Sequence, residues 1–175
     1  MKIKKTPLDG VFIIKPSPNI DDRGFFQRVF CKKVFKEKKI ENSILQINNS
    51  YNKKKGTTRG LHYQSGSSAE CKMLRCIKGS LVNIVVDIRK ESKNYLKSTL
   101  IYLNADNRHM SYIPRGFANG LQTLEDDTEL IYFTTNYYNP EKEKGLSIQD
   151  PKLKIKLPLP IKVISTKDKN WPFLK

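Results

Sequence analysis

Two histidines, His62 and His109, are the only imidazoles in the chain. His62 lies in the polar stretch 56–64, three residues after Arg59, so a group that exchanges protons near neutral pH follows a fixed positive charge. On a regular strand this odd separation points the two side chains to opposite faces, unless a bulge or turn at Gly60 intervenes. The spacing alone favours a partly buried His62 with one hydrogen bond, and His109 is interpreted as a loop residue.

Four further side chains could move protons or stabilise charge: Lys72, Tyr132, Tyr138 and Asp168. Each also has an ordinary explanation, as a solvated lysine, a core aromatic with a hydrated hydroxyl, a turn residue and a carboxylate in a charged tail. Taken one at a time, the ordinary explanations are favoured. Only the combination indicates a catalytic site.

Short apolar segments separated by turn residues must position these groups. They recur at a spacing typical of all-β sandwiches and barrels, at residues 11–14, 25–30, 44–47, 73–77, 81–88, 99–103, 110–113 and 129–135. We therefore expect eight or more short strands, with a short surface helix over 32–41, half a helical turn at 142–146 and an extended tail over 151–175. The chain has neither an internal repeat nor a low-complexity linker, which predicts a single domain over residues 1–175.

The residue types argue against a metal centre. Two histidines cannot form a histidine-rich site within one chain, and His62 is followed by Tyr63 and Gln64, so the closely spaced histidine pair of many metal-binding cupins is absent. The three cysteines form no CxxC pair and are expected to be reduced and mostly buried. We predict neither a metal nor an organic cofactor.

The charge balance leaves a small anionic ligand open. Lys and Arg number 33 against 17 Asp and Glu, a net charge of +16, but lysine is spread along the chain among acidic residues. A basic RNA-binding β-barrel therefore rests on charge alone, and we expect no nucleic-acid partner. The longest apolar runs are far shorter than the roughly 18 residues of a membrane span, and Pro7 and Asp9 interrupt the basic start before an apolar signal core forms. We expect a cytoplasmic protein without a membrane partner.

Several segments, in order and spacing, resemble the dTDP-4-dehydrorhamnose 3,5-epimerase family over essentially the whole chain. They are Asp22-Arg23-Gly24-Phe25-Phe26, Gln46-Ile47-Asn48-Asn49-Ser50, residues 56–64 with Arg59-Gly60-Leu61-His62-Tyr63-Gln64, Val86-Asp87-Ile88-Arg89 with Ser92, Ile113-Pro114-Arg115-Gly116-Phe117-Ala118, and Asp150-Pro151. The resemblance implies an all-β, cupin-like jelly-roll (double-stranded β-helix) with short peripheral helices, working as a homodimer without metal or cofactor. It also implies an isomerase acting on a nucleotide-diphosphate-linked 4-keto-6-deoxy sugar.

The resemblance assigns roles to individual residues. His62 would be the base, Asp168 would orient its ring, Tyr132 would be the acid, and Lys72 would stabilise the enolate oxygen. Arg23, Arg59 and Lys167 would bind the diphosphate, because guanidinium and ammonium groups suit phosphate oxygens. The remaining family contact positions are Gln46 and Asn48 at the nucleotide end, together with Arg28, Tyr138 and Glu143.

One departure bears on the substrate. Asn119 stands where the family has a substrate-lining histidine, and asparagine cannot carry a proton or a charge near neutral pH. The leading interpretation is inversion at C3 and C5 of dTDP-4-dehydro-6-deoxy-D-glucose, giving dTDP-4-dehydro-L-rhamnose for polysaccharide biosynthesis. The sequence leaves open a C3-only epimerase, an enzyme for a CDP- or GDP-linked sugar, and a non-catalytic sugar-nucleotide binder.

Overall fold

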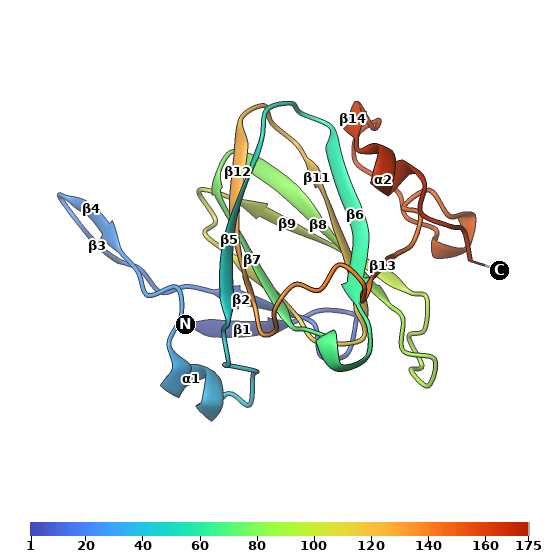
Figure 1. Cartoon of the computed structure of the whole chain (residues 1–175). Coiled ribbons are helices and arrows are strands. Elements are labelled where there is room, and N and C mark those ends of the chain that lie inside the picture. Colours follow the sequence, from blue (N-terminus) through green and yellow to red (C-terminus); the bar gives the residue numbers. More distant parts are fainter. Residues whose placement is uncertain (175) are drawn as a thin grey trace.

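The computed structural model describes residues 1–174, which fold mainly into strands (Figure 1). The strands are β1 (Lys2–Lys5), β2 (Phe12–Lys15), β3 (Asn19–Asp21), β4 (Gly24–Phe26), β5 (Gln46–Asn52), β6 (Thr57–Gln64), β7 (Lys72–Lys78), β8 (Ser80–Asp87), β9 (Ser98–Asn104), β10 (Met110–Ile113), β11 (Phe117–Thr123), β12 (Thr128–Thr134), β13 (Glu143–Gly145) and β14 (Val163–Ile164). The helical elements are α1 (Lys32–Glu37), η1 (Gly66–Ser68), η2 (Pro151–Leu153) and α2 (Thr166–Lys169).

Two sheets make the body of the molecule. One has the order β1-β2-β10-β7-β12-β5, and the other has the order β13-β6-β11-β8-β9 with β14 added beside β6. Their pairings are antiparallel except for β14 with β6. Neighbouring strands are mostly far apart in sequence, which is the crossed-over order of a jelly-roll. The predicted all-β jelly-roll is confirmed.

The core lies between the sheets because side chains alternate along each strand. On β7, Leu74 and Cys76 face inward and pack with Leu81, Val85 and Ile101 from the opposite sheet. Apolar residues of alternate positions therefore hold the two layers together at one end, and polar residues are free to line the other end.

A second apolar cluster covers part of the outer face of the first sheet. There α1 places Phe35 against Met73, Met110 and Phe133. The helix is shorter than the predicted 32–41, because Lys39 adopts a positive φ of 56° and the Ile40 amide donates to the Phe35 carbonyl, a hydrogen bond that closes a helix end.

The eight predicted segments overlap eight of the described strands, and the missed strands are β1, β3, β6, β11, β13 and β14. The long strands among these, β6 and β11, were missed because polar residues interrupt their apolar positions. The expected helical turn over 142–146 is wrong: β13 forms there, because Glu143–Gly145 pairs with Tyr63 and its neighbours on β6. The expected extended tail is only partly correct, since the short helical elements η2 and α2 interrupt it, whereas β14 is extended; residue 175 lies outside the described residues.

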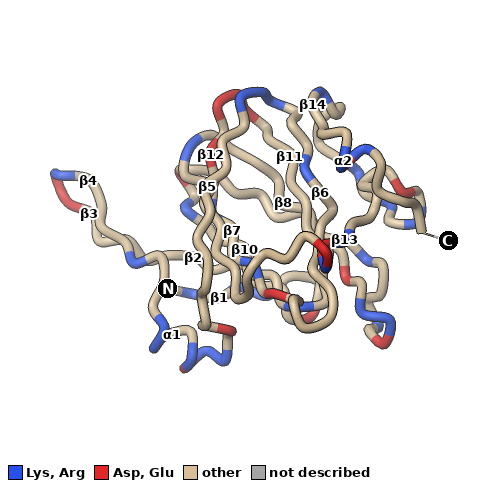
Figure 2. Tube along the Cα trace, in the orientation of Figure 1, with Lys and Arg blue, Asp and Glu red and all other residues tan. Residues whose placement is uncertain are grey.

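Charged residues are spread along the chain. Figure 2 shows Lys and Arg at loops and chain ends around the visible trace, interspersed with Asp and Glu. The helices within residues 1–174 are all too short or too polar to span a membrane.

Candidate active site

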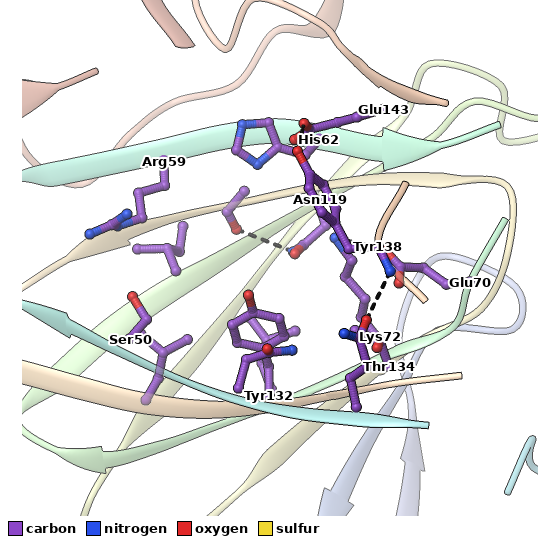
Figure 3. Close-up of a pocket in the computed structure, with 16 residues that line it drawn as sticks. Ser50, Arg59, His62, Glu70, Lys72, Asn119, Tyr132, Thr134, Tyr138 and Glu143 are labelled. Carbon is purple, nitrogen blue, oxygen red and sulfur yellow. Dashed lines mark hydrogen bonds and ion pairs between the residues drawn. The ribbon is translucent and has the colours of Figure 1, made fainter. Parts of the chain in front are cut away.

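A cavity of about 490 Å³ opens between the two sheets at the end where polar side chains replace the apolar core (Figure 3). Its wall is formed by Gln46, Asn48, Ser50, Arg59, His62, Glu70, Lys72, Leu74, Asn119, Gly120, Leu121, Leu130, Tyr132, Thr134, Tyr138 and Glu143. The structure thus brings nine of the thirteen predicted site residues to one cavity.

A bulge on β6 places Arg59 and His62 on the same side. His62 pairs with Asn119, whereas Arg59 pairs with Leu121, so three steps on β6 match two on β11. Gly60 permits this, because its φ is +95° and a Cβ would lie 2.6 Å from the Asn119 carbonyl oxygen. A bulge at Gly60 was the condition under which the sequence allowed Arg59 and His62 to share a face. The structure has this bulge, and both side chains line the cavity.

His62 is held by Asp168. The Nε2 atom of His62 lies 2.5 Å from Asp168 Oδ1, and the Gly60 amide donates to Oδ2 at 3.2 Å. Asp168 is 5% exposed and lies on α2. Ser165 caps the start of this helix, because its hydroxyl oxygen accepts a hydrogen bond from the Asp168 amide. Burial acts to raise the pKa of Asp168, but the hydrogen bond and charge of His62, with the Gly60 and Trp171 donors, outweigh it and hold the pKa below its usual value.

Tyr132 faces the cavity from the opposite sheet, on β12, as Figure 3 shows. Burial raises the pKa of its hydroxyl, and the negative charge of Glu70 adds to this, against a smaller opposing effect of Arg59. The hydroxyl therefore keeps its proton at neutral pH. An imidazole on β6 and a protonated hydroxyl on β12 thus stand on opposite sides of one cavity.

Lys72 brings positive charge to the same cavity. It begins β7, and its Nζ lies 3.2 Å from Glu70 Oε1, with side chains 19% and 7% exposed. Glu70 was not predicted from the sequence. An acid two residues before Lys72 in a strand-like segment points to the same face, and that spacing is a signal that could have revealed it.

A polar network borders the cavity. Glu143 on β13 accepts from the Tyr138 hydroxyl at 2.6 Å and from Lys167 Nζ at 2.5 Å. Burial acts to raise the pKa of Glu143, but Lys167, Tyr138 and His62 together lower it, so the carboxylate is ionised. Gln46 fixes the Tyr138 backbone by accepting from its amide at 2.9 Å.

The remaining polar residues present donors. The Nε atom of Arg59 donates a hydrogen bond to Asn52 Oδ1 at 2.7 Å, which leaves the end of the guanidinium facing the cavity. Asn119 donates through Nδ2 to the Ile84 and Gly120 carbonyl oxygens, each at 3.3 Å. Asn48 on β5 completes the row that starts with Gln46.

Asp168 and Lys167 do not line this cavity but contact His62 and Glu143, which do. Two further predicted contact residues, Arg23 and Arg28, lie away from it. Arg23 is at the tip of the β3–β4 hairpin, which projects from the body (Figure 1), and its side chain is 91% exposed and paired only with Asp21. Arg28 lies beyond the hairpin, in a small crevice with Arg75 and Arg108. Neither arginine lines the cavity of its own chain.

The described residues contain no cluster of three His, Cys, Asp or Glu side chains that could hold a metal ion. Cys31, Cys71 and Cys76 are unpaired thiols, and the latter two are buried.

Comparisons with known proteins agree with this geometry. The family model described as dTDP-4-dehydrorhamnose 3,5-epimerase matches residues 5–175. A dTDP-4-dehydrorhamnose 3,5-epimerase of Shigella flexneri is 38% identical, over 97% of this chain and 94% of its own length.

Solved structures give the same result. The epimerase of that name from Bacillus anthracis, with TDP and PPi bound, superposes with a TM-score of 0.96 at 33% identity, over 99% of both chains. A Legionella pneumophila enzyme in complex with dTDP-4-keto-L-rhamnose gives 0.93 at 34% identity, over 98% of this chain and 92% of that one. The chain belongs to the dTDP-4-dehydrorhamnose 3,5-epimerase family.

Proposed function

We propose that this chain is an isomerase that inverts C3 and C5 of dTDP-4-dehydro-6-deoxy-D-glucose and so forms dTDP-4-dehydro-L-rhamnose. The observation that carries the proposal is the placement of His62, backed by Asp168, and of Tyr132 on opposite sheets of one cavity. The ligands named for the similar structures, TDP and dTDP-4-keto-L-rhamnose, are of the class that this cavity would bind.

The reaction needs a base on one face of the sugar and an acid on the other. The C4 ketone acidifies the hydrogens on C3 and C5, because the electron pair left by either proton delocalises onto the C4 oxygen as an enolate. The ring nitrogen of His62 that Asp168 leaves free accepts the proton, and Asp168 stabilises the resulting imidazolium. Tyr132 then delivers a proton to the same carbon from the opposite face, and the centre is inverted.

Lys72 stabilises the intermediate. Its ammonium group, held by Glu70, offers positive charge where the C4 oxygen becomes negative. Such an interaction is stronger in the transition state than with the neutral ketone, so it lowers the barrier rather than merely tightening binding.

The same cavity offers groups for the rest of the substrate. Arg59 and Lys167 bind the diphosphate, and Gln46 and Asn48 contact the nucleotide. Asn119, Tyr138 and Glu143 contact the sugar. Because the Nδ2 atom of Asn119 is engaged with backbone carbonyls, its Oδ1 atom is the part left to accept from a sugar hydroxyl.

The active form is a homodimer of single-domain chains. The outer face of the first sheet exposes Ile47, Tyr51 and Ile77, at 63%, 52% and 38%, beside a hairpin that exposes Ile20 and Phe26 at 72% and 66%. A projecting arm and an apolar face of this kind suit a second copy of the chain. When the hairpin of one chain packs on the apolar face of the other, it brings Arg23 and the adjacent Arg28 toward the partner's cavity. Both arginines then contribute to the substrate site of the partner chain, although neither lines the cavity of its own chain.

The test is a deuterium wash-in. The purified protein is incubated in deuterated water with dTDP-4-dehydro-6-deoxy-D-glucose, beside the His62→Asn variant, and the sugar is followed by mass spectrometry and proton NMR. Incorporation at C3 and C5, abolished in the variant, is expected. Incorporation at C3 alone would replace the proposal with a C3-epimerase, and no incorporation above the variant would refute epimerisation of this substrate.

A further inference from the structure

Trp171 lies against the His62–Asp168 pair without forming part of the cavity wall. Its Nε1 atom donates to Asp168 Oδ1 at 3.2 Å, the same oxygen that contacts His62. Its ring is edge-on to the imidazole, with centroids 6.1 Å apart. The indole therefore contacts both members of the pair from the side away from the substrate.

The fold makes room for this ring. Gly145 is paired with His62 across β13 and β6, and a Cβ at Gly145 would lie 2.3 Å from the indole carbons. The residue after the tryptophan is also fixed, because the Ser147 amide donates to the Pro172 carbonyl at 3.1 Å. The tail is thus anchored on both sides of Trp171, by α2, which carries Asp168, before it and by this bond after it.

We propose that Trp171 is a positioning residue for the reaction, holding the Asp168 carboxylate in the one orientation that serves His62. The inference rests on the proposed function. Three donors share the two carboxylate oxygens: Gly60 fixes Oδ2, while Trp171 and His62 share Oδ1. Without the indole N–H, only the imidazole holds Oδ1, and the carboxylate and the ring can turn together away from the substrate.

Charge around the pair also enters. Glu143 on β13 and Lys167 on α2 face the same region, and Lys167 Nζ lies 5.8 Å from the indole centroid. Because Glu143 and Lys167 pair with each other at 2.5 Å, their opposite charges largely cancel at Asp168. The groups that donate hydrogen bonds to Asp168 therefore have the larger effect on its ionisation. Burial, the largest effect, acts to raise the pKa of Asp168. The hydrogen bonds from His62 and Gly60 lower it, and the indole N–H of Trp171 lowers it further.

The kinetic test is Trp171→Phe, which keeps a ring over Gly145 but removes the N–H. We expect kcat to fall about tenfold, as for a lost hydrogen bond to a charged group, with KM changed less than about twofold because Trp171 does not line the cavity. Phe173→Leu is the matched control: Phe173 is 58% exposed in the same tail and should leave both constants unchanged. A purely structural role predicts wild-type kcat in Trp171→Phe, and that result would overturn the proposal.

A second readout needs no substrate. Trp171 is the single tryptophan of the chain, so intrinsic fluorescence reports this position alone. Emission should change in acid as Asp168 gains a proton, before unfolding seen by circular dichroism, and Asp168→Asn should lack the change. An identical acid response in Asp168→Asn would contradict the contact. Wild-type protein inactive in the wash-in would instead refute the proposed function, so the two failures are distinguishable.

Discussion

Glu70 and Lys72 form an ion pair inside the cavity, with Glu70 Oε1 3.2 Å from Lys72 Nζ and both side chains largely shielded from water. The two residues point the same way because they are separated by two positions at the start of β7. An acid near a site that builds negative charge on a substrate oxygen is unfavourable in itself. Two effects explain why Glu70 is present. It fixes the position of the Lys72 ammonium group, and its negative charge helps to raise the pKa of Tyr132.

Glu70→Gln tests the second effect. Burial is the larger cause of the raised pKa of Tyr132, and Glu70 adds to it, so removal of the carboxylate lowers this pKa. The tyrosine then loses its proton at lower pH, and the alkaline limb of the kcat profile moves to lower pH. At neutral pH we expect kcat to change less than about tenfold, because the Lys72 side chain still lines the cavity. The shift must be absent when the substitution is made in a Tyr132→Phe background, and a shift that persists there would assign the limb to another group.

Tyr132→Phe separates proton removal from proton delivery. His62 can still take a proton and return it to the same face, so exchange of C3 and C5 hydrogens with deuterated water continues. Inversion needs delivery from the opposite sheet and should fall by about 100-fold. Comparing deuterium content by mass spectrometry with product configuration by NMR gives both rates on one sample. Equal loss of exchange and inversion would argue against a pure acid role for Tyr132.

How far the sequence predicts this site depends on distance along the chain. The strand period explains why Lys72 and Glu70 share a face, and local spacing allowed for a bulge at Gly60. The pairing of His62 with Asp168 joins positions 106 residues apart, and no periodicity reveals it. It was predicted only through the resemblance, because the arrangement depends on the tail packing beside β6.

The strands show the same limit. Short apolar segments predicted β7, β8 and β12, whereas β6 was missed because cavity-lining polar residues replace the apolar positions that would reveal it. The strand that carries His62 and Arg59 therefore escaped the hydrophobic pattern, although β7 and β12, which carry Lys72 and Tyr132, did not. Arg23 shows a further limit, since its proposed role needs a second copy of the chain.

Asp168 should make stability depend on acid pH. Its pKa in the folded protein lies below the ordinary 3.8, so the ionised carboxylate stabilises the fold; this contribution is fully present above the unfolded-state pKa and is lost as pH falls through the folded-state value. In Asp168→Asn the free energy of unfolding should therefore decline less between about pH 5 and pH 3 than in the wild type. At neutral pH the variant should be about 1–3 kcal/mol less stable, and kcat should fall by about 100-fold or more. Urea unfolding at each pH measures the first effect, and an unchanged acid slope would contradict it.

Subunit complementation tests whether Arg23 serves the partner's cavity. Arg23→Ala should weaken substrate binding, since a diphosphate contact is lost, and His62→Asn should be inactive. In a mixed dimer the chain with intact His62 receives Arg23 from the His62→Asn chain, so one complete site forms. Unfolding and refolding the two variants together should restore about a quarter of the wild-type sites, because half of randomly paired dimers are mixed and each has one complete site of two.

The control for that experiment is Lys53→Ala in place of Arg23→Ala, since Lys53 is an exposed lysine in the turn between β5 and β6. The Lys53→Ala chain keeps both Arg23 and His62, so its sites are complete before mixing. Mixing it with the His62→Asn chain should therefore add no activity beyond that of the Lys53→Ala chains. If Arg23 acted within its own chain, every site of the mixed dimer would lack either Arg23 or His62, and the mixture would show only the residual activity of Arg23→Ala. Recovery above that level, measured at substrate concentrations below KM, therefore distinguishes a site built from two chains from one built from a single chain.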